Sequence, residues 1–121
     1  MASEIKENST NTFNLRVLAA SCEVNEILEV IAKRWKMQIL FSISKDVNQF
    51  SLLKKAFPAI SDQVLGKRLG ELLTEGLIDK TIVENTCPFQ VVYSATEKGQ
   101  ALLVIIHELH LWGKKKWDTI S

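Results

Sequence analysis

The chain has 121 residues, of which 46% are hydrophobic and 24% charged, and its formal net charge at pH 7 is +1. This length and composition are typical of one globular domain with a sizeable core, and the small net charge excludes the strongly basic field of many nucleic-acid-binding proteins. The two cysteines are too few for a disulfide scaffold, and no apolar run is long enough to span a bilayer. We therefore expect a cytoplasmic protein that does not enter a membrane.

Residues 1–20 are expected to form an N-terminal arm that is partly disordered. Residues 13–18 within it are largely apolar, which suggests contact with the body of the protein or with a second copy, as a helix or as a strand. Ser21 is expected to be the N-cap of a helix that runs to Lys33, with one apolar stripe formed by Val24, Ile27, Leu28 and Ile31. A second buried helix is expected over residues 35–44.

Two short helices separated by a proline-containing turn come next. Residues 51–57 favour the first helix, and Ser61 is a good N-cap for the second, because its hydroxyl can accept a hydrogen bond from an amide of the first turn. Gly76 is expected to close the second helix in the left-handed conformation. The leucines of this helix recur at helical spacing on one face: Leu65, Leu69, Leu72 and Leu73. This is the arrangement of a helix-turn-helix, whose second helix enters the major groove of DNA.

After the second helix the residue pattern becomes that of β-strands. Residues 77–84 and 89–95 are rich in β-branched and aromatic residues, and residues 85–88 have the composition of a turn. A β-hairpin directly after a helix-turn-helix is a wing. The expected fold class is therefore α+β and mainly helical, a winged helix-turn-helix over residues 21–96 with a two-stranded wing.

Residues 97–121 are expected to form a C-terminal dimerisation helix and tail, capped by Thr96 and helical to about Trp117. The apolar residues of this helix cover more than the single stripe that a surface helix needs. One side is expected to pack on its own domain, through Leu102, Ile105, Ile106 and Leu109. The remaining apolar surface requires a second partner, so we expect a homodimer whose interface includes Val104, Leu111 and Trp112, beside Ala101.

Residues around the second helix of the helix-turn-helix are candidates for DNA contact. Gln63 and Lys67 lie one turn apart on its outward face, and their side chains are long enough to reach base edges; the alternative is a solvated helix face. Ser61, with the free amides at the helix start, is a candidate for holding a phosphate. Arg68 either holds a phosphate or pairs with a glutamate of its own helix.

Cys22 is a candidate thiol sensor, because its expected place at a helix N-terminus can activate a thiol; the alternative is a buried structural cysteine. His107 and His110 are spaced as a metal pair on a helix, but no third ligand supports them, so we expect no metal site. A glycine-rich phosphate loop and a nucleophile–base set are both missing from the sequence. We therefore expect no catalytic residues, no cofactor and no enzymatic activity.

Several short motifs follow one another in a fixed order along the chain. They are Cys22, Lys33-Arg34-Trp35-Lys36 with Ile39-Leu40, Phe50-Ser51-Leu52-Leu53, Pro58-Ala59-Ile60-Ser61 with Leu65, Arg68-Leu69, Glu71-Leu72, Glu75-Gly76-Leu77-Ile78, Pro88 and Val91-Val92-Tyr93-Ser94-Ala95-Thr96-Glu97-Lys98-Gly99. In this order and at this spacing the chain resembles the HxlR-type winged helix-turn-helix transcriptional regulators of bacteria, from about Cys22 to Trp112. The resemblance implies a dimeric, cytoplasmic repressor or activator that binds double-stranded DNA. Members of the family often respond to a small-molecule effector or to thiol-reactive stress.

The chain also departs from the family pattern at three places. Glu23 follows Cys22 where the family usually has proline, and Gly66 stands where a hydroxyl residue is common. The wing segment 84–92 contains no Lys or Arg, although the family usually has a basic residue near Gln90. These departures leave an alternative function open, a winged-helix protein–protein interaction module without DNA binding.

Overall fold

The structure, a computed structural model, describes residues 2–116, and it describes side chains from residue 11 onward. The chain divides into two compact units, residues 1–34 and 35–121. The expected end of the last helix near Trp117 lies outside the described residues. None of the described helices is both long enough and apolar enough to cross a membrane.

The first unit contains one continuous helix, α1 (Ala2–Ile31). The expectation that a helix starts at Ser21 is wrong, because this residue lies in the interior of α1. Residues 2–31 include neither Gly nor Pro, so nothing in the sequence interrupts the helix. Its apolar positions recur at alternating steps of four and three residues, the spacing of a coiled-coil seam: Phe13, Val17, Ala20, Val24, Ile27 and Ile31.

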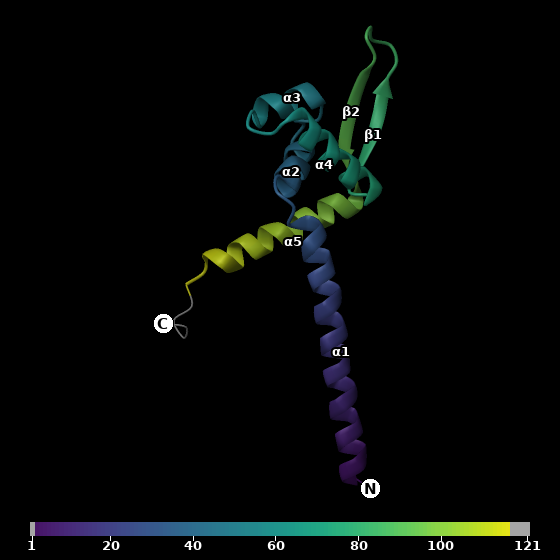
Figure 1. Cartoon of the computed structure of the whole chain (residues 1–121), viewed down its shortest axis with the longest axis vertical. Coiled ribbons are helices and arrows are strands. Elements are labelled where there is room, and N and C mark those ends of the chain that lie inside the picture. Colours follow the sequence, from purple (N-terminus) through teal and green to yellow (C-terminus); the bar gives the residue numbers. More distant parts are fainter. Residues whose placement is uncertain (1, 117–121) are drawn as a thin grey trace. The chain divides into compact units, whose positions relative to one another are not determined.

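The second unit contains the expected winged helix-turn-helix. Its elements in chain order are α2 (Lys36–Ser44), α3 (Phe50–Ala56), α4 (Asp62–Thr74), β1 (Ile78–Val83), β2 (Gln90–Ala95) and α5 (Glu97–Lys114) (Figure 1). The two strands form an antiparallel hairpin whose register runs from Ile78 opposite Ala95 to Val83 opposite Gln90. The predicted fold class and the predicted wing are therefore confirmed.

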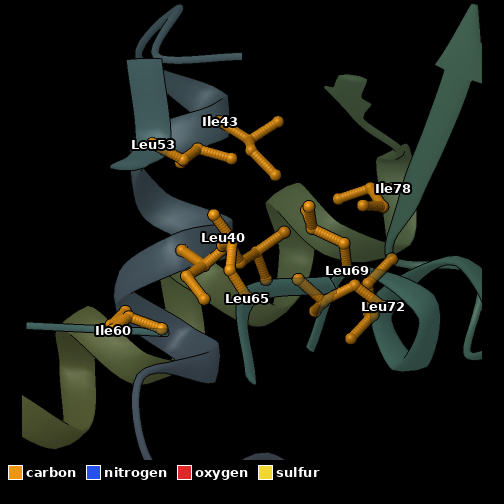
Figure 2. Packing of buried hydrophobic residues seen from close by; sticks show 10 residues of the cluster. Leu40, Ile43, Leu53, Ile60, Leu65, Leu69, Leu72 and Ile78 are labelled. Atoms are coloured by element: carbon orange, nitrogen blue, oxygen red, sulfur yellow. The ribbon is translucent and has the colours of Figure 1, made fainter. Parts of the chain in front are cut away.

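The core of the second unit lies where α2, α3 and α4 meet the start of the hairpin. Leucine and isoleucine side chains from each of these elements point toward one another (Figure 2). The buried set is Ile39, Leu40, Ile43, Leu53, Ile60, Leu65, Leu69, Leu72, Leu77 and Ile78. Since α4 buries its leucine face here, its opposite face is left to solvent.

Three predicted end signals act as expected. The Ser61 hydroxyl accepts a hydrogen bond from the Val64 amide at 3.1 Å, and the Thr96 hydroxyl accepts one from the Gly99 amide at 3.0 Å. Gly76 follows α4 with a φ of 71°, in the left-handed region that favours glycine. These residues fix where α4 and α5 begin and where the chain turns into the wing.

The terminal helix α5 packs on its own unit over a narrower strip than expected. Leu102 and Leu103 are half-buried against the core, together with the buried Gly99. The prediction that Ile105 and Leu109 pack on the same unit is wrong, because their side chains are 61% and 51% exposed. The side of α5 beside α2 carries Leu103, Ile106 and His110, and Ile105 and Leu109 lie on another side of the helix. The residues predicted for dimerisation are also exposed: Val104, Leu111 and Trp112.

Candidate nucleic-acid interface

The turn between α3 and α4 is held by a lysine of α3. The Lys54 ammonium donates a hydrogen bond to the Ile60 carbonyl and lies 3.2 Å from a carboxylate oxygen of Asp62, the first residue of α4. Ile60 is buried in the core, so the turn is fixed on its inner side as well. These contacts fix how α4 leaves the turn, and with it the direction of the face that α4 presents to solvent.

The outward face of α4 carries the two residues predicted to read bases. Gln63 and Lys67 are both exposed and stand one turn apart on this helix. Gly66 and Gly70 on the same helix have no side chain, and the space around them is open, because a β-carbon added at either position would meet no atom within 4 Å. Ser61 is exposed at the helix start, where its hydroxyl oxygen already caps the Val64 amide. The face is therefore shallow and polar, with two long side chains that project from it.

Arg68 adopts the second of its two expected roles. Its guanidinium donates to both carboxylate oxygens of Glu71, at 3.1 and 3.3 Å, and its side chain is 15% exposed. The carboxylate of Glu71 also lies 3.7 Å from the ammonium of Lys36, on helix α2. Arg68 is thus bound to the flank of α4, beside the predicted DNA-reading face.

Sequence reasoning missed Lys36, which is the first residue of α2. Its side chain is fully buried, and its ammonium lies 2.6 Å from a carboxylate oxygen of Glu75 at the end of α4. A signal for this burial was present in the sequence, since Lys36 shares helical spacing with Ile39, Leu40 and Ile43, the buried residues of α2. A lysine on the apolar stripe of a helix indicates a buried ion pair.

The wing is attached to the helix-turn-helix at two places. The Tyr93 amide on β2 donates to the Asn48 carbonyl before α3 at 2.9 Å, and burial raises the pKa of the Tyr93 hydroxyl above its usual value. At the base of the wing, the Thr96 amide donates to the Leu77 carbonyl at 3.0 Å, and the Lys98 ammonium of α5 donates to the Glu75 carbonyl at 2.8 Å. The hairpin therefore leaves the domain in a direction set by backbone hydrogen bonds.

The base of the wing carries an exposed cation, and its tip carries none. Lys80 on β1 is exposed near the domain, whereas the segment 84–92 contains no Lys or Arg. Ile82 and Phe89 are large apolar residues exposed toward the tip, by 52% and 67%. Lys80 near the base of the wing could hold a DNA phosphate, whereas the tip has no cation that could do so.

A groove of about 950 Å³ lies between α2 and α5. Its walls are mainly apolar and include Phe41, Phe57, Leu103 and Val104. The basic residues Lys45, His107 and His110 also line it, and none of the described residues that line it is acidic. Over the described residues, no group of three or more potential metal-ligating side chains comes together, so the two histidines do not form part of such a cluster.

Both cysteines are exposed and unbonded. Cys22 lies in the interior of α1 and not at the start of a helix, so the expected activation of its thiol by a helix N-terminus is wrong. On the helical wheel of α1 it lies opposite the apolar seam, on the side that carries Glu26 and Glu29. Cys87 lies in the turn of the wing.

Comparison with known proteins agrees with this geometry. A family model described as HxlR-like helix-turn-helix matches residues 30–121. The chain is 35% identical to the HTH-type transcriptional regulator YvaP of Bacillus subtilis over 91 residues, which cover 75% of this chain and 83% of that protein. It is 37% identical to the HTH-type transcriptional regulator YdzF of the same organism over 87 residues, which cover 71% of this chain and 79% of that protein. The crystal structure of diamide-treated YodB from B. subtilis superposes with a TM-score of 0.65 at 27% identity, over 74% of this chain and 88% of that chain.

Proposed function

The chain belongs to the HxlR-like helix-turn-helix family, and we propose that it is a DNA-binding transcriptional regulator that acts as a homodimer in the cytoplasm. The observation that carries this proposal is the outward face of α4. Gln63 and Lys67 are exposed there on a helix whose start is fixed by the α3–α4 turn and whose end is held by Lys98 of α5. Such a face can enter a major groove and donate to base edges without rearrangement of the domain.

Phosphate contacts in this proposal come from the surroundings of α4. Ser61 and the amides at the start of α4 hold one phosphate, and Lys67 reads bases with Gln63. Arg68 is assigned a contact at the rim of the interface, beside its ion pair with Glu71. Because the wing tip brings no cation, we expect few phosphate contacts and a shallow dependence of affinity on salt.

Dimerisation is supported by apolar surface that the monomer leaves exposed. On α5, the side chains of Val104, Leu111 and Trp112 are 61%, 53% and 62% exposed. A second contribution comes from α1, whose heptad-spaced residues, including those of segment 13–18, have no core of their own unit to enter. Two copies that pair through these helices would place two α4 helices about one turn of DNA apart, or a small multiple of it.

A response to a thiol oxidant or to a small molecule is part of the proposal. Its support on the thiol side is the exposure of Cys22, together with the similarity to YodB, whose structure was determined after treatment with diamide, a thiol oxidant. On the small-molecule side, the groove between α2 and α5 is concave, apolar and of the size usual for a ligand pocket.

The competing function is a winged-helix protein–protein module that does not bind DNA. The wing tip without cations and the glycines of α4 favour it. Selection from a pool of random duplex DNA, followed by a salt titration of the selected duplex, tests the two. Enrichment of a sequence with an inverted repeat, and an affinity that falls with salt, are expected of the regulator. A protein that enriches no sequence and binds no duplex at low salt would overturn the proposed function.

A further inference from the structure

A chain of alternating charges links the start of α2 to one flank of α4. The order is Arg68, Glu71, Lys36 and Glu75, with Glu71 between the two cations at 3.1 and 3.7 Å and Lys36 2.6 Å from Glu75. Positions 68, 71 and 75 share one flank of α4, between its buried leucines and its outward face. The four charges sum to zero, so this cluster adds no net attraction for DNA.

The arrangement of Lys36 and Glu75 is poor for stability alone. Lys36 begins α2 and Glu75 caps the end of α4, so the cation lies at a helix N-terminus and the anion at a helix C-terminus, each opposed by the dipole of its own helix. One carboxylate oxygen of Glu75 is buried, and no hydrogen-bond partner reaches it in the described part of the chain. Buried ion pairs of this kind are often replaceable by apolar residues without loss of stability.

The pair of Lys36 and Glu75 fixes the position of α4 relative to α2. The Lys36 side chain is fully buried and its ammonium lies 2.6 Å from Glu75 at the end of α4, a short contact that allows little sliding or rotation of α4 over α2. The same flank adjoins the face that carries Lys67 and Gln63. On these grounds we propose that Lys36 is a positioning residue for sequence recognition: through Glu75 and Glu71 it sets the rotation of α4, and with it which base edges Gln63 and Lys67 reach.

This inference rests on the proposed function, because it concerns how DNA sequence is discriminated. The measured quantity is the ratio of affinities for the selected duplex and for a scrambled duplex of the same length, at one salt concentration. Partial unfolding lowers the active concentration for both duplexes equally, and an added negative charge near α4 weakens both. Neither effect changes the ratio, whereas a rotated reading helix does.

The variants are Lys36→Met and a charge-swapped triple variant, Lys36→Glu/Glu71→Gln/Glu75→Lys, each compared with the wild-type protein. We expect Lys36→Met to lower the ratio by about tenfold or more, and to lower the Tm as well, because the carboxylates of Glu75 and Glu71 lose the cation that they share. The charge-swapped protein is expected to recover the ratio to within about threefold, because each new charge suits the dipole of its helix, the pair is kept, and the neutral amide at position 71 does not repel the new carboxylate.

Every result of these measurements either supports or overturns the role proposed for Lys36. A Lys36→Met protein with the wild-type ratio would overturn it, as would a folded charge-swapped protein whose ratio stays as low as that of Lys36→Met. If Lys36→Met fails to fold, the charge-swapped protein decides alone: a wild-type ratio supports the inference, and a low ratio or failure to fold overturns it. A wild-type protein that selects no duplex would instead remove the proposed function on which the inference rests.

Discussion

Gly99 stands against the backbone of Leu77, so that a β-carbon added to it would lie 2.2 Å from the Leu77 carbonyl oxygen. The same carbonyl accepts the Thr96 amide at 3.0 Å. The first turn of α5 is therefore pressed onto the chain where α4 gives way to β1, and only a glycine fits at this contact.

We expect Gly99→Ala to destabilise the fold by about 1–3 kcal/mol, because the backbone of α5 or of β1 must move to admit the methyl group. The measurement is urea or thermal unfolding. Gly70→Ala is the matched control, since the added carbon meets nothing within 4 Å on an exposed helical position, and it should stabilise the protein by up to about 1 kcal/mol. Equal effects of the two substitutions would contradict the close contact.

Lys67→Ala should weaken binding to the selected duplex by about 1–3 kcal/mol and relax the base preference at one position of each half-site. The reason is the loss of a donor that reaches base edges from the exposed face of α4. Affinity measured by fluorescence anisotropy on a panel of single-base variants checks both effects. Lys115→Ala, which removes a charge after the end of α5, should change little. Normal binding and unchanged base preference in Lys67→Ala would show that this face does not read DNA.

Replacement of Leu111 and Trp112 by serine should convert the dimer into a monomer or an aggregate. These side chains are 53% and 62% exposed in the single chain, and burial of such apolar area is the main stabilisation that a helix-to-helix interface offers. Sedimentation velocity gives the mass directly. Ile82→Ser is the control, because this residue is similarly exposed but lies on the wing. A doubly substituted protein that sediments as a dimer would place the interface elsewhere.

Cys22→Ser should keep DNA affinity in reductant and remove a loss of affinity caused by diamide. Both cysteines are exposed, so Cys87→Ser provides a matched control that should still respond. Because Cys22 lies opposite the apolar seam of α1, we expect an oxidant to modify it without joining it to Cys22 of a second copy that pairs through this seam. A covalent dimer on non-reducing electrophoresis would contradict that orientation, and a wild-type protein indifferent to diamide would show that the cysteine is structural.

Local signals were sufficient to predict most of the winged domain. The Ser61 and Thr96 caps, the positive φ at Gly76 and the leucine face of α4 each follow from a preference of that residue type at that place in a helix. The helix start at Ser21 failed for a related reason. A hydroxyl residue before an apolar stripe resembles a cap, but Phe13 and Val17 extend the same heptad spacing backward without a break.

The features that could not be predicted depend on contacts between segments distant in sequence. Lys36 meets Glu75 across 39 positions, and a lysine in an apolar stripe does not by itself identify its partner. The exposure of Ile105 and Leu109 likewise depends on which side of α5 lies against α2, which periodicity within α5 cannot specify. Periodicity gives the apolar faces of a helix but not the extent of the surface that covers them.

The cation-free tip of the wing has a consequence for how the protein searches a genome. Attraction to phosphates holds a regulator on DNA of any sequence, and its strength grows with the number of cations that reach the backbone. A domain that brings few of them should dissociate quickly from unrelated DNA, so more copies diffuse freely between encounters. Occupancy of a promoter would then respond promptly to changes in protein concentration, and a modest loss of base contacts would empty the promoter.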